Sequence, residues 1–498
     1  MDISTVLKEH EKHAVQIDEL TIANDYDGLK VYLEQFADIT FPDDEPESSY
    51  MLYYLGTGYG TLATYYQKDD STSKDATEYR KRSFSYLRKA IDLFETHGNN
   101  LILLLRAYTN YANELDSCGR VIEAIRIYRK ALALAPKFSM ARGNYGRSLQ
   151  FYANKVNDSG HYKELHHFAY QAMIKALENP DDSLYKEAQL YFHKKIKEYE
   201  AIQDKSILSK PIIFKKYALG KYDERNYRLW CLEHHLFLNP LNDLIELEFA
   251  FAHDPLTITT YTENSAIDGE TSVEDCNPPK WFAMLNQLKE EYISARYLCY
   301  EGSQKQCLPH YADKDVKLTL SSYDYVNYSI RLEQLKSSYR NLFSIFDQVA
   351  FMINEFWQLG LSEREADAHH VFIKCDKYPN ENVALKALYW SYLDFCEKFG
   401  ISNNAAEKDL KILRNAFEHK FVKVHEHPCT NKMEIAADRF YHISEEDLVQ
   451  YTLRLLELSR EFIMELVYAI GIEESKKTHD KSNVVKLDIA DYEDNWKI

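Results

Sequence analysis

The most regular hydrophobic pattern in the chain starts near residue 325. Apolar residues there recur every three or four positions without a break, which is the spacing of one face of a long helix. The members of this series are Leu332, Leu335, Tyr339, Leu342, Phe346, Val349, Ile353 and Phe356. The pattern predicts one helix of about thirty residues, ended by Gly360, that packs in a bundle or a coiled-coil seam.

Other segments of the C-terminal half show the same helical periodicity. They are Lys280 to about Tyr300, 383–398, 404–424 and 445–470. The last segment follows Ser444 and opens with three acidic residues, an arrangement typical of a capped helix N-terminus. Several long helices within about 150 residues predict a four-helix bundle over 315–472. A polar tail, 473–498, follows the bundle, and its stretch 484–489 could form a short strand.

A pattern of large, small and aromatic residues occupies the N-terminal half. It appears first at Leu52, Leu55, Gly56 and Tyr59, and again around Tyr108 and around Gly146. Small residues let neighbouring helices approach closely, and large aromatic residues fill the spaces between them. The spacing resembles that of tetratricopeptide repeats and predicts three helical hairpins over 48–204. Such repeats either present a groove to a peptide or protein, or only support the rest of the chain.

Two further segments complete the expected organisation. Residues 1–47 contain two short amphipathic helical patterns and end in an acidic, proline-containing break. Residues 205–314 are expected to form a connecting helical module, and they begin with the lysine-rich run 205–221. This run either contacts phosphates or is a solvated linker.

The composition supports an all-α protein. The 498 residues include only 15 Gly and 12 Pro, too few for the turns of a β protein or for phosphate-binding loops, whereas 39 Tyr supply aromatic packing. The net charge of −18 argues against nonspecific coating of nucleic acid and leaves room for a local basic site.

The distribution of apolar residues and cysteines along the chain indicates where in the cell the protein is expected. The chain has no uncharged apolar stretch of about eighteen residues and no apolar signal-peptide core, so we expect a cytoplasmic protein that does not associate with membranes. Its eight cysteines are scattered and include no C-x-x-C pair, which is typical of reduced thiols rather than of disulfides or a zinc ribbon.

The candidate chemistry lies in residues 410–424. With about 100° of rotation per residue, five apolar residues form a stripe that is expected to face the bundle core. They are Leu410, Leu413, Phe417, Phe421 and Val424. His419 lies about 180° from this stripe, next to Asn415, and Ile412 and Ala416 flank the pair. This second, mixed face predicts packing against a second copy of the same helix.

Arg414, Asn415 and His419 form an R-x4-H motif within the predicted bundle. The motif, with the repeats before it, resembles HEPN-domain ribonucleases of the subgroup that carries N-terminal tetratricopeptide-like repeats and is associated with bacterial defence and toxin functions. The resemblance implies a C-terminal HEPN four-helix bundle, a homodimer in which two motifs meet, and endoribonuclease activity without a metal or other cofactor. It also implies an RNA substrate, such as a tRNA or another structured RNA.

The residue types suit this chemistry. RNA carries its own nucleophile, the 2′-hydroxyl, so the protein needs a proton carrier and a cation. An imidazole that titrates near pH 6.5 can take and return a proton, and a guanidinium can bind phosphate oxygens and stabilise the added negative charge. We expect His419 and Arg414 to fill these roles and Asn415 to orient one of them. The products would be a 2′,3′-cyclic phosphate and a 5′-hydroxyl.

Neighbouring charges extend the candidate site. Between Lys408 and Lys432 the chain has six Lys or Arg and three acidic residues, within an acidic domain. We expect Lys411, Lys420 and Lys423 to contact RNA. Some HEPN proteins carry an acid on the long helix near the site, so the resemblance implies a supporting role for Asp347. A surface aspartate is the plain alternative.

Other interpretations remain open. Arg414 could pair with Glu418 one turn later and leave His419 solvated. The bundle could only dimerise while the repeats bind a protein, as in a non-catalytic adaptor. The run His425-Glu426-His427-Pro428-Cys429 could supply three metal ligands, as in a metal hydrolase, although no companion cluster exists at ligand spacing.

The repeats also suggest regulation. A broadly specific ribonuclease would harm its host, so we expect residues 48–200 to keep the site quiet or to bind a protein or phage-derived trigger that activates it. Gly56, Gly58 and Gly60 do not indicate a dinucleotide loop, because they fall inside a predicted helix.

Overall fold

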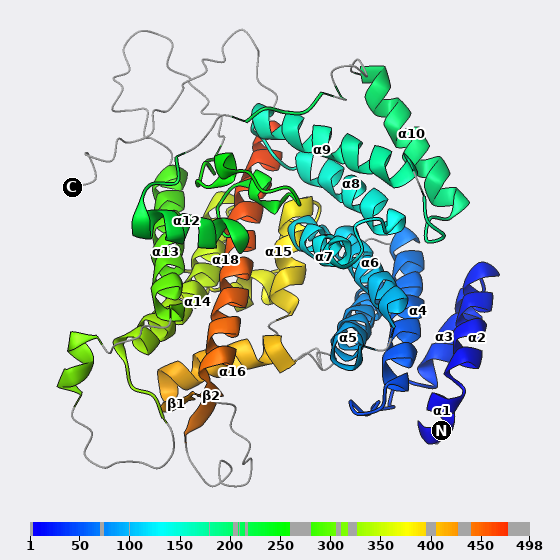
Figure 1. The fold of residues 1–498 in the computed structure, drawn as a ribbon, viewed down its shortest axis with the longest axis horizontal. Helices are drawn as coiled ribbons and strands as arrows, with labels where there is room; N and C mark the ends of the chain where they lie inside the picture. The colour runs from blue at the N-terminus through cyan, green and yellow to red at the C-terminus, as the bar shows by residue number, and fades with distance from the viewer. Residues whose placement is uncertain are drawn as a thin grey trace.

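The fold is all-α, as the periodicity predicts, with one small sheet (Figure 1). The computed structural model describes residues 3–69, 74–98, 100–178, 180–202, 208, 210–214, 218–258, 280–304, 310–316, 326–394, 405–426 and 440–476. Among these residues no helix is both long and apolar enough to cross a lipid bilayer. The predicted strand at 484–489 lies outside the described residues, as do most lysines of the basic run.

Helical hairpins fill the N-terminal half, which lies on the right of Figure 1. Their helices are α4 (Glu47–Asp69) and α5 (Lys74–His97), α6 (Leu101–Ser117) and α7 (Val121–Leu134), and α8 (Ser139–Ala153) and α9 (Ser159–Glu178). The prediction of three hairpins is therefore confirmed. Three short helices precede them rather than the two expected: α1 (Ile3–Lys8), α2 (His10–Ile22) and α3 (Tyr26–Glu34). Helix α10 (Lys186–Ile202) follows them.

Small residues set how closely the paired helices pack. A Cβ atom added to Gly56 of α4 would lie 2.8 Å from Cγ of Leu87 in α5. A Cβ atom added to Gly146 of α8 would lie 2.8 Å from the carbonyl oxygen of Ala169 in α9. Both distances are shorter than van der Waals contact, so these helix pairs require glycine where the repeat pattern places it.

The connecting region is partly helical. It contains α12 (Tyr222–Glu233), η1 (Pro240–Asp243), η2 (Phe249–Phe251) and, after residues that are not described, α13 (Lys280–Ser303) and η3 (Tyr311–Asp315). Helix α13 packs along the long helix α14 (Ile330–Phe356), where the Ser338 hydroxyl donates to the Ala295 carbonyl at 2.7 Å. The connecting region thus belongs structurally to the C-terminal bundle as much as to the repeats.

Helix α14 confirms the uninterrupted hydrophobic series. Every member of that series except Phe356 is buried, and Ser329 caps the helix by accepting a hydrogen bond from the N–H of Leu332 at 3.3 Å. The helix ends at Phe356, four residues before Gly360, which adopts a φ of +83°. The remaining bundle elements are η4 (His370–Lys374), α15 (Val383–Leu393), α16 (Ala405–His419) and α18 (Glu445–Ser475).

A two-stranded parallel sheet lies beside α16 (Figure 1). Strand β1 (Val422–His425) pairs with β2 (Tyr441–Ser444), in a register that places Val422 opposite Tyr441. The predicted helix over 404–424 is therefore too long, because α16 ends at His419 and the β-branched Val422 and Val424 continue as a strand. Ser444 then caps α18 by accepting from the N–H of Asp447 at 3.0 Å, as predicted.

Buried ion pairs join the repeats to the bundle. Arg120, which directly precedes α7, and Arg88 of α5 both contact Asp394, which follows α15. Lys155, which follows α8, contacts Glu465 of α18 at 2.7 Å. The two halves of the chain therefore form one continuous structure across the face formed by α7, α15 and α18.

Candidate active site

Helix α16 positions the R-x4-H motif at the edge of the bundle. Leu410 and Leu413 are fully buried against the core, and the Tyr339 hydroxyl of α14 donates to the Leu410 carbonyl at 2.6 Å. Phe417 packs edge-to-face against Tyr339, with ring centroids 5.4 Å apart. These contacts fix the orientation of α16, so the motif is held by a packed helix and not by a loop.

Arg414 reaches solvent, and its partners among the described residues lie on its own helix. Its Nε lies 3.2 Å from Oε1 of Glu418, and one of its terminal nitrogens donates to Oδ1 of Asn415 at 3.2 Å. The side chain of Arg414 is 37% exposed and that of Glu418 is 38% exposed. The intrahelical Arg414–Glu418 pair that the sequence offered as an alternative is therefore present. At this exposure such a pair contributes only about 0.3–0.5 kcal/mol and yields readily to a phosphate.

His419 is the last residue of α16, and its side chain is 72% exposed. Its nearest charged neighbour is Glu418, with 3.9 Å between Nε2 and Oε2. The prediction that His419 is not a core histidine is confirmed. The structure brings Arg414, Asn415 and His419 together on the solvent-facing side of one helix, with Glu418 among them.

Asp347 of α14 lies near the motif without an ion pair to it in the described structure. Its carboxylate accepts a hydrogen bond from the N–H of Ala368 at 3.0 Å and so holds the segment before η4 against α14. Burial raises the pKa of Asp347, and the charge of Arg414 acts in the opposite direction. The charge of Arg414 therefore influences the pKa of Asp347, but the hydrogen bond of Asp347 is to the backbone of Ala368.

One of the three lysines lies within α16 and two follow it. Lys411 precedes Arg414 by one turn and is half-buried, and Lys420 directly follows His419 and is exposed. Lys423 in β1 places its Nζ over the ring of Phe440, 4.1 Å from the centroid.

Two residues of the predicted faces lie elsewhere than expected. Phe421 was expected in the core but is 77% exposed, because α16 has ended before it. Ala416 was expected on the outer face but is 2% exposed and packs inside its own subunit. Instead, Phe421 and Phe440 contact each other with ring centroids 5.8 Å apart and form an exposed aromatic pair beside His419. The hydrophobic pattern does not predict this pair, because it extends the helical periodicity to Val424 whereas α16 ends at His419.

The sequence pattern does not single out His370, a second histidine near the motif. His370, in η4, contacts Asp367 through Nδ1 at 2.7 Å. Next to it, His369 is close enough to Lys411 for that cation to lower the pKa of His369, in addition to the larger effect of burial. In the sequence, the two adjacent histidines shortly after Asp367 were the feature that could have drawn attention to this segment.

The metal interpretation gains no support from the described residues. His425 contacts His442 across the sheet, with 2.9 Å between Nε2 and Nδ1, and the rings stack. His427 and Cys429 lie outside the described residues. Within those residues no group of three or more His, Cys, Asp or Glu side chains could hold a metal ion.

Comparison with protein families decides what this bundle is. Residues 272–473 match the model of the LA2681-like HEPN family. The C-terminal part of the chain belongs to the HEPN family. The match begins before α13 and ends within α18, so the HEPN domain includes α13, which the predicted boundary at residue 315 leaves out. No curated protein and no solved structure matches the chain.

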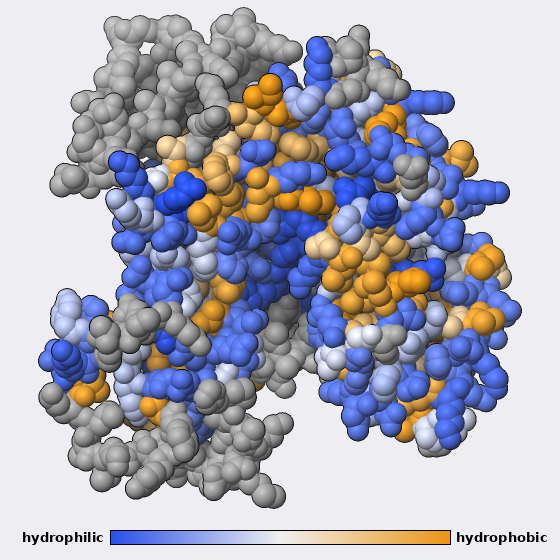
Figure 2. Space-filling model, in the orientation of Figure 1, coloured by the Kyte–Doolittle hydropathy of each residue, from blue (hydrophilic) through white to orange (hydrophobic). Residues whose placement is uncertain are grey.

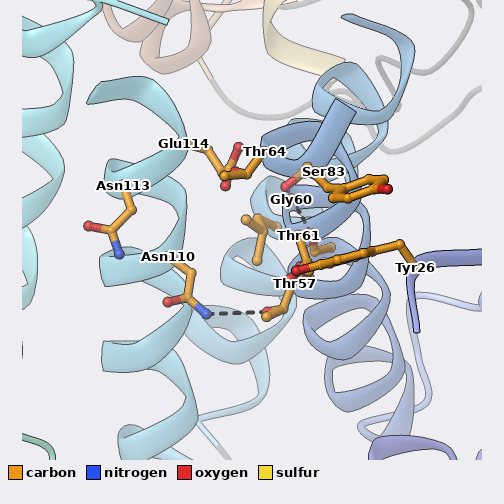
Figure 3. A pocket seen from close by; sticks show the side chains of 12 residues that line it. Tyr26, Thr57, Gly60, Thr61, Thr64, Ser83, Asn110, Asn113 and Glu114 are labelled. Atoms are coloured by element: carbon orange, nitrogen blue, oxygen red, sulfur yellow. Dashed lines mark hydrogen bonds between the residues drawn. The ribbon is translucent and has the colours of Figure 1, made fainter. Parts of the chain in front are cut away.

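The repeats before the HEPN domain have a polar cavity of their own (Figure 3). It has a volume of about 260 Å³ and lies between α4, α5 and α6. Asn110 of α6 donates to the Thr57 hydroxyl of α4 at 3.2 Å, and Glu114 points into the same space. Tyr26 stacks on Tyr65 at its rim, with ring centroids 3.9 Å apart. The cavity offers hydrogen-bonding groups to a polar partner of the repeats.

Proposed function

We propose that this protein is an endoribonuclease whose HEPN domain cleaves RNA through the 2′-hydroxyl, with Arg414, Asn415 and His419 as the catalytic residues. The observation that carries the proposal is the exposure of Arg414 and His419 on a helix whose inner residues Leu410, Leu413 and Phe417 are buried. A substrate can reach both side chains without disturbing the core. The HEPN family is often ribonucleolytic, and the residue types supply the required proton carrier and cation.

In this mechanism His419 removes the proton from the 2′-hydroxyl or returns a proton to the leaving 5′-oxygen. Arg414 leaves Glu418 and binds the non-bridging phosphate oxygens, so its charge stabilises the pentacovalent transition state. Asn415 already contacts Arg414 and orients it. Lys411, Lys420 and Lys423 attract the RNA backbone.

We propose further that the active form is a homodimer in which two motifs meet. A single motif supplies one imidazole, whereas the reaction uses both a base and an acid. The exposed Phe421–Phe440 pair beside His419 gives the apolar surface for this contact. Ala416, which the sequence places on this surface, cannot contribute to the contact because it is buried within the subunit. A role in anti-phage defence or as a toxin, with the polar cavity of the repeats as the trigger site, completes the proposal.

The test is to incubate the purified full chain with total RNA in EDTA and to map the ends of the products. We expect cleavage that yields 2′,3′-cyclic phosphates and 5′-hydroxyls, because no metal is required. Light scattering at micromolar concentration should show a dimer. Cleavage that EDTA abolishes would favour the metal hydrolase instead.

The second candidate is a non-catalytic adaptor that dimerises and binds a protein through its repeats. The Arg414–Glu418 ion pair favours the adaptor, since Glu418 already neutralises the guanidinium that a ribonuclease would use to bind phosphate. No cleavage by full-length protein, together with capture of a protein by the repeats that a change at Asn110 abolishes, would support the adaptor and exclude the ribonuclease.

A further inference from the structure

A second cavity lies where the repeats, the connecting region and the HEPN domain meet. Its volume is about 310 Å³, and its walls come from α7, from the end of α12 and the turn after it, and from α18. In Figure 2 strongly hydrophilic residues gather in the hollow between the two halves of the molecule, where α7 and α18 approach each other. On α18 the cavity is lined by Glu457, Arg460 and Glu461, from the middle of the helix, whereas α16, which carries the R-x4-H motif, lies near the N-terminal end of α18 (Figure 1).

One face of α7 supplies the positive wall. Arg126, Arg129 and Lys130 stand at positions i, i+3 and i+4, so all three side chains project from the same side of the helix into the cavity. Ile122 and Ala133 extend this face by one turn in each direction. The spacing concentrates three cations within about two helical turns.

Two of the four carboxylates around the cavity, Asp243 and Glu457, already form ion pairs with arginines. Asp243 binds Arg460 through both oxygens, at 2.8 and 3.0 Å. Glu457 contacts Arg126 and also Arg454. Glu461 is fully enclosed, and burial together with nearby Glu123 raises its pKa to about 7, so it carries only part of a charge at neutral pH. Glu233 is exposed at the rim.

Arg129 and Lys130 consequently lack a carboxylate partner within the described structure. Arg129 contacts the ring of His235 and donates to the carbonyl of Asp243 at 3.2 Å. Burial lowers the pKa of Arg129 to about 10 and also lowers that of Lys130. Asp92 and Glu95 of α5 attract Lys130 from beyond ion-pair distance. Asp243 attracts Arg129 in the same way, so both cations have carboxylates in their surroundings but form no ion pair with them in the described structure, and Lys130 reaches solvent at the mouth of the cavity.

The remaining described side chains around the cavity do not supply such an ion-pair partner. Burial lowers the pKa of His235 to about 3, so its ring is neutral. Burial also lowers the pKa of His234, whose ring packs beside Trp230 with centroids 5.0 Å apart. Nε of Arg126 is buried and has no hydrogen-bond partner in the described structure. A polar atom in this state indicates a missing acceptor.

We propose that this cavity binds a small phosphorylated molecule, with its phosphate group held by Arg129 and Lys130 of the repeats. The volume lies at the lower end of the range for small-molecule sites, so the ligand is of mononucleotide size or smaller. A guanidinium and an ammonium one residue apart present donors that match phosphate oxygens. Because α7 belongs to the repeats and α18 to the HEPN domain, the ligand would tie these two parts together.

The proposal is independent of ribonuclease activity and is tested by binding. Isothermal titration calorimetry of the full chain with pyrophosphate and with AMP, at constant ionic strength, should give saturable one-to-one binding. Arg129→Gln and Lys130→Gln should each weaken it at least tenfold. Arg142→Gln is the matched control, because Arg142 of α8 donates only to the carbonyl of Pro136 at the surface, and it should bind like the wild type.

Lys130 is exposed, so Lys130→Gln tests the site even if Arg129→Gln fails to fold. Two results would overturn the proposal. One is the absence of saturable binding of either probe to the wild-type protein. The other is unchanged affinity in Lys130→Gln. Binding of a short RNA oligonucleotide that depends on Lys130, with no binding of pyrophosphate or AMP, would assign the cavity to RNA and also contradict it.

Discussion

Two arginines of the HEPN domain show how differently one side chain is used. Arg460 of α18 is 2% exposed, and its guanidinium donates to the Phe237 and Asn239 carbonyls and to both oxygens of Asp243. The side chain of Arg414 in α16 is 37% exposed, and among the described residues it contacts Glu418 and Asn415 of its own helix. Every guanidinium nitrogen of Arg460 donates to the protein, whereas the contacts of Arg414 in the described structure are all intrahelical.

This difference separates structural cations from those available to a substrate. A buried guanidinium whose hydrogen bonds are all made cannot bind a phosphate without breaking the fold. An exposed guanidinium with a weak intrahelical partner can exchange that partner at little cost. We therefore assign Arg460 to the junction between the halves of the chain and Arg414 to the reaction.

Replacing Arg460 should have the largest effect on stability. Arg460→Met leaves Asp243 buried without its cation, and we expect the free energy of unfolding to fall by about 3–5 kcal/mol. Urea denaturation followed by circular dichroism measures this change. Asp243→Asn in the same background should recover part of it. Arg142→Met, which removes hydrogen bonds to the Pro136 carbonyl and no ion pair of the described structure, should stay within about 0.5 kcal/mol of the wild type, and a similarly small change for Arg460→Met would refute the structural role.

Replacing His419 should abolish activity and leave stability unchanged. His419→Ala removes the proton carrier, and we expect the rate of RNA cleavage to fall about 10²–10⁴-fold. The thermal midpoint should not move, because the side chain is 72% exposed. His161→Ala, a change at a histidine of the repeats, serves as the control and should cleave normally. Cleavage by His419→Ala at the wild-type rate would remove this residue from the site.

The buried Glu461 predicts a pH dependence at the junction. Its pKa is raised from 4.5 to about 7 in the folded protein, so the folded state binds the proton more tightly than the unfolded chain does. The stability that this group contributes is present at acid pH and is lost as the pH rises through 7. Glu461→Gln should thus be more stable than the wild type at pH 8, by about 1–3 kcal/mol.

Unfolding curves of both proteins between pH 5 and pH 8 measure this difference, which should shrink as the pH falls. Lower stability of Glu461→Gln than of the wild type at pH 8 would show that the charged carboxylate is needed by Arg126 and its neighbours.

Releasing Arg414 from its helical partner should have the smallest effect. Glu418→Gln removes the ion pair to Arg414, so the free energy of unfolding should fall by no more than about 0.5 kcal/mol. RNA cleavage should be retained or increased, because the guanidinium is free to bind phosphate. Single-turnover rates with an excess of enzyme give the comparison. A loss as large as that for His419→Ala would make Glu418 itself a catalytic group.

The same contrast explains what the sequence could predict. Periodicity was sufficient for α14, because its apolar residues are spaced regularly and nearly all face the core. It also placed the hairpins, because Gly56 and Gly146 mark the close helix contacts. The exposed position of His419 followed from simple helix geometry. These features depend on residues close together in the sequence, so the spacing of apolar and small residues predicts them.

Features that depend on contacts between distant segments could not be predicted in this way. The parallel pairing of Val422 with Tyr441 ended α16 early and exposed Phe421. The junction joins Arg460 to Asp243 and Lys155 to Glu465, residues that are far apart in the sequence. No spacing rule relates such pairs, so both the charge network and the cavity beside it became visible only in the structure.

The central claim is tested most directly by the cleavage rate of Arg414→Ala. The variant and the wild type are compared on the same RNA in EDTA, with equal thermal midpoints confirmed beforehand. Loss of a cation that stabilises the transition state should lower the rate by at least about 100-fold. A folded Arg414→Ala protein that cleaves RNA at the wild-type rate would contradict the account.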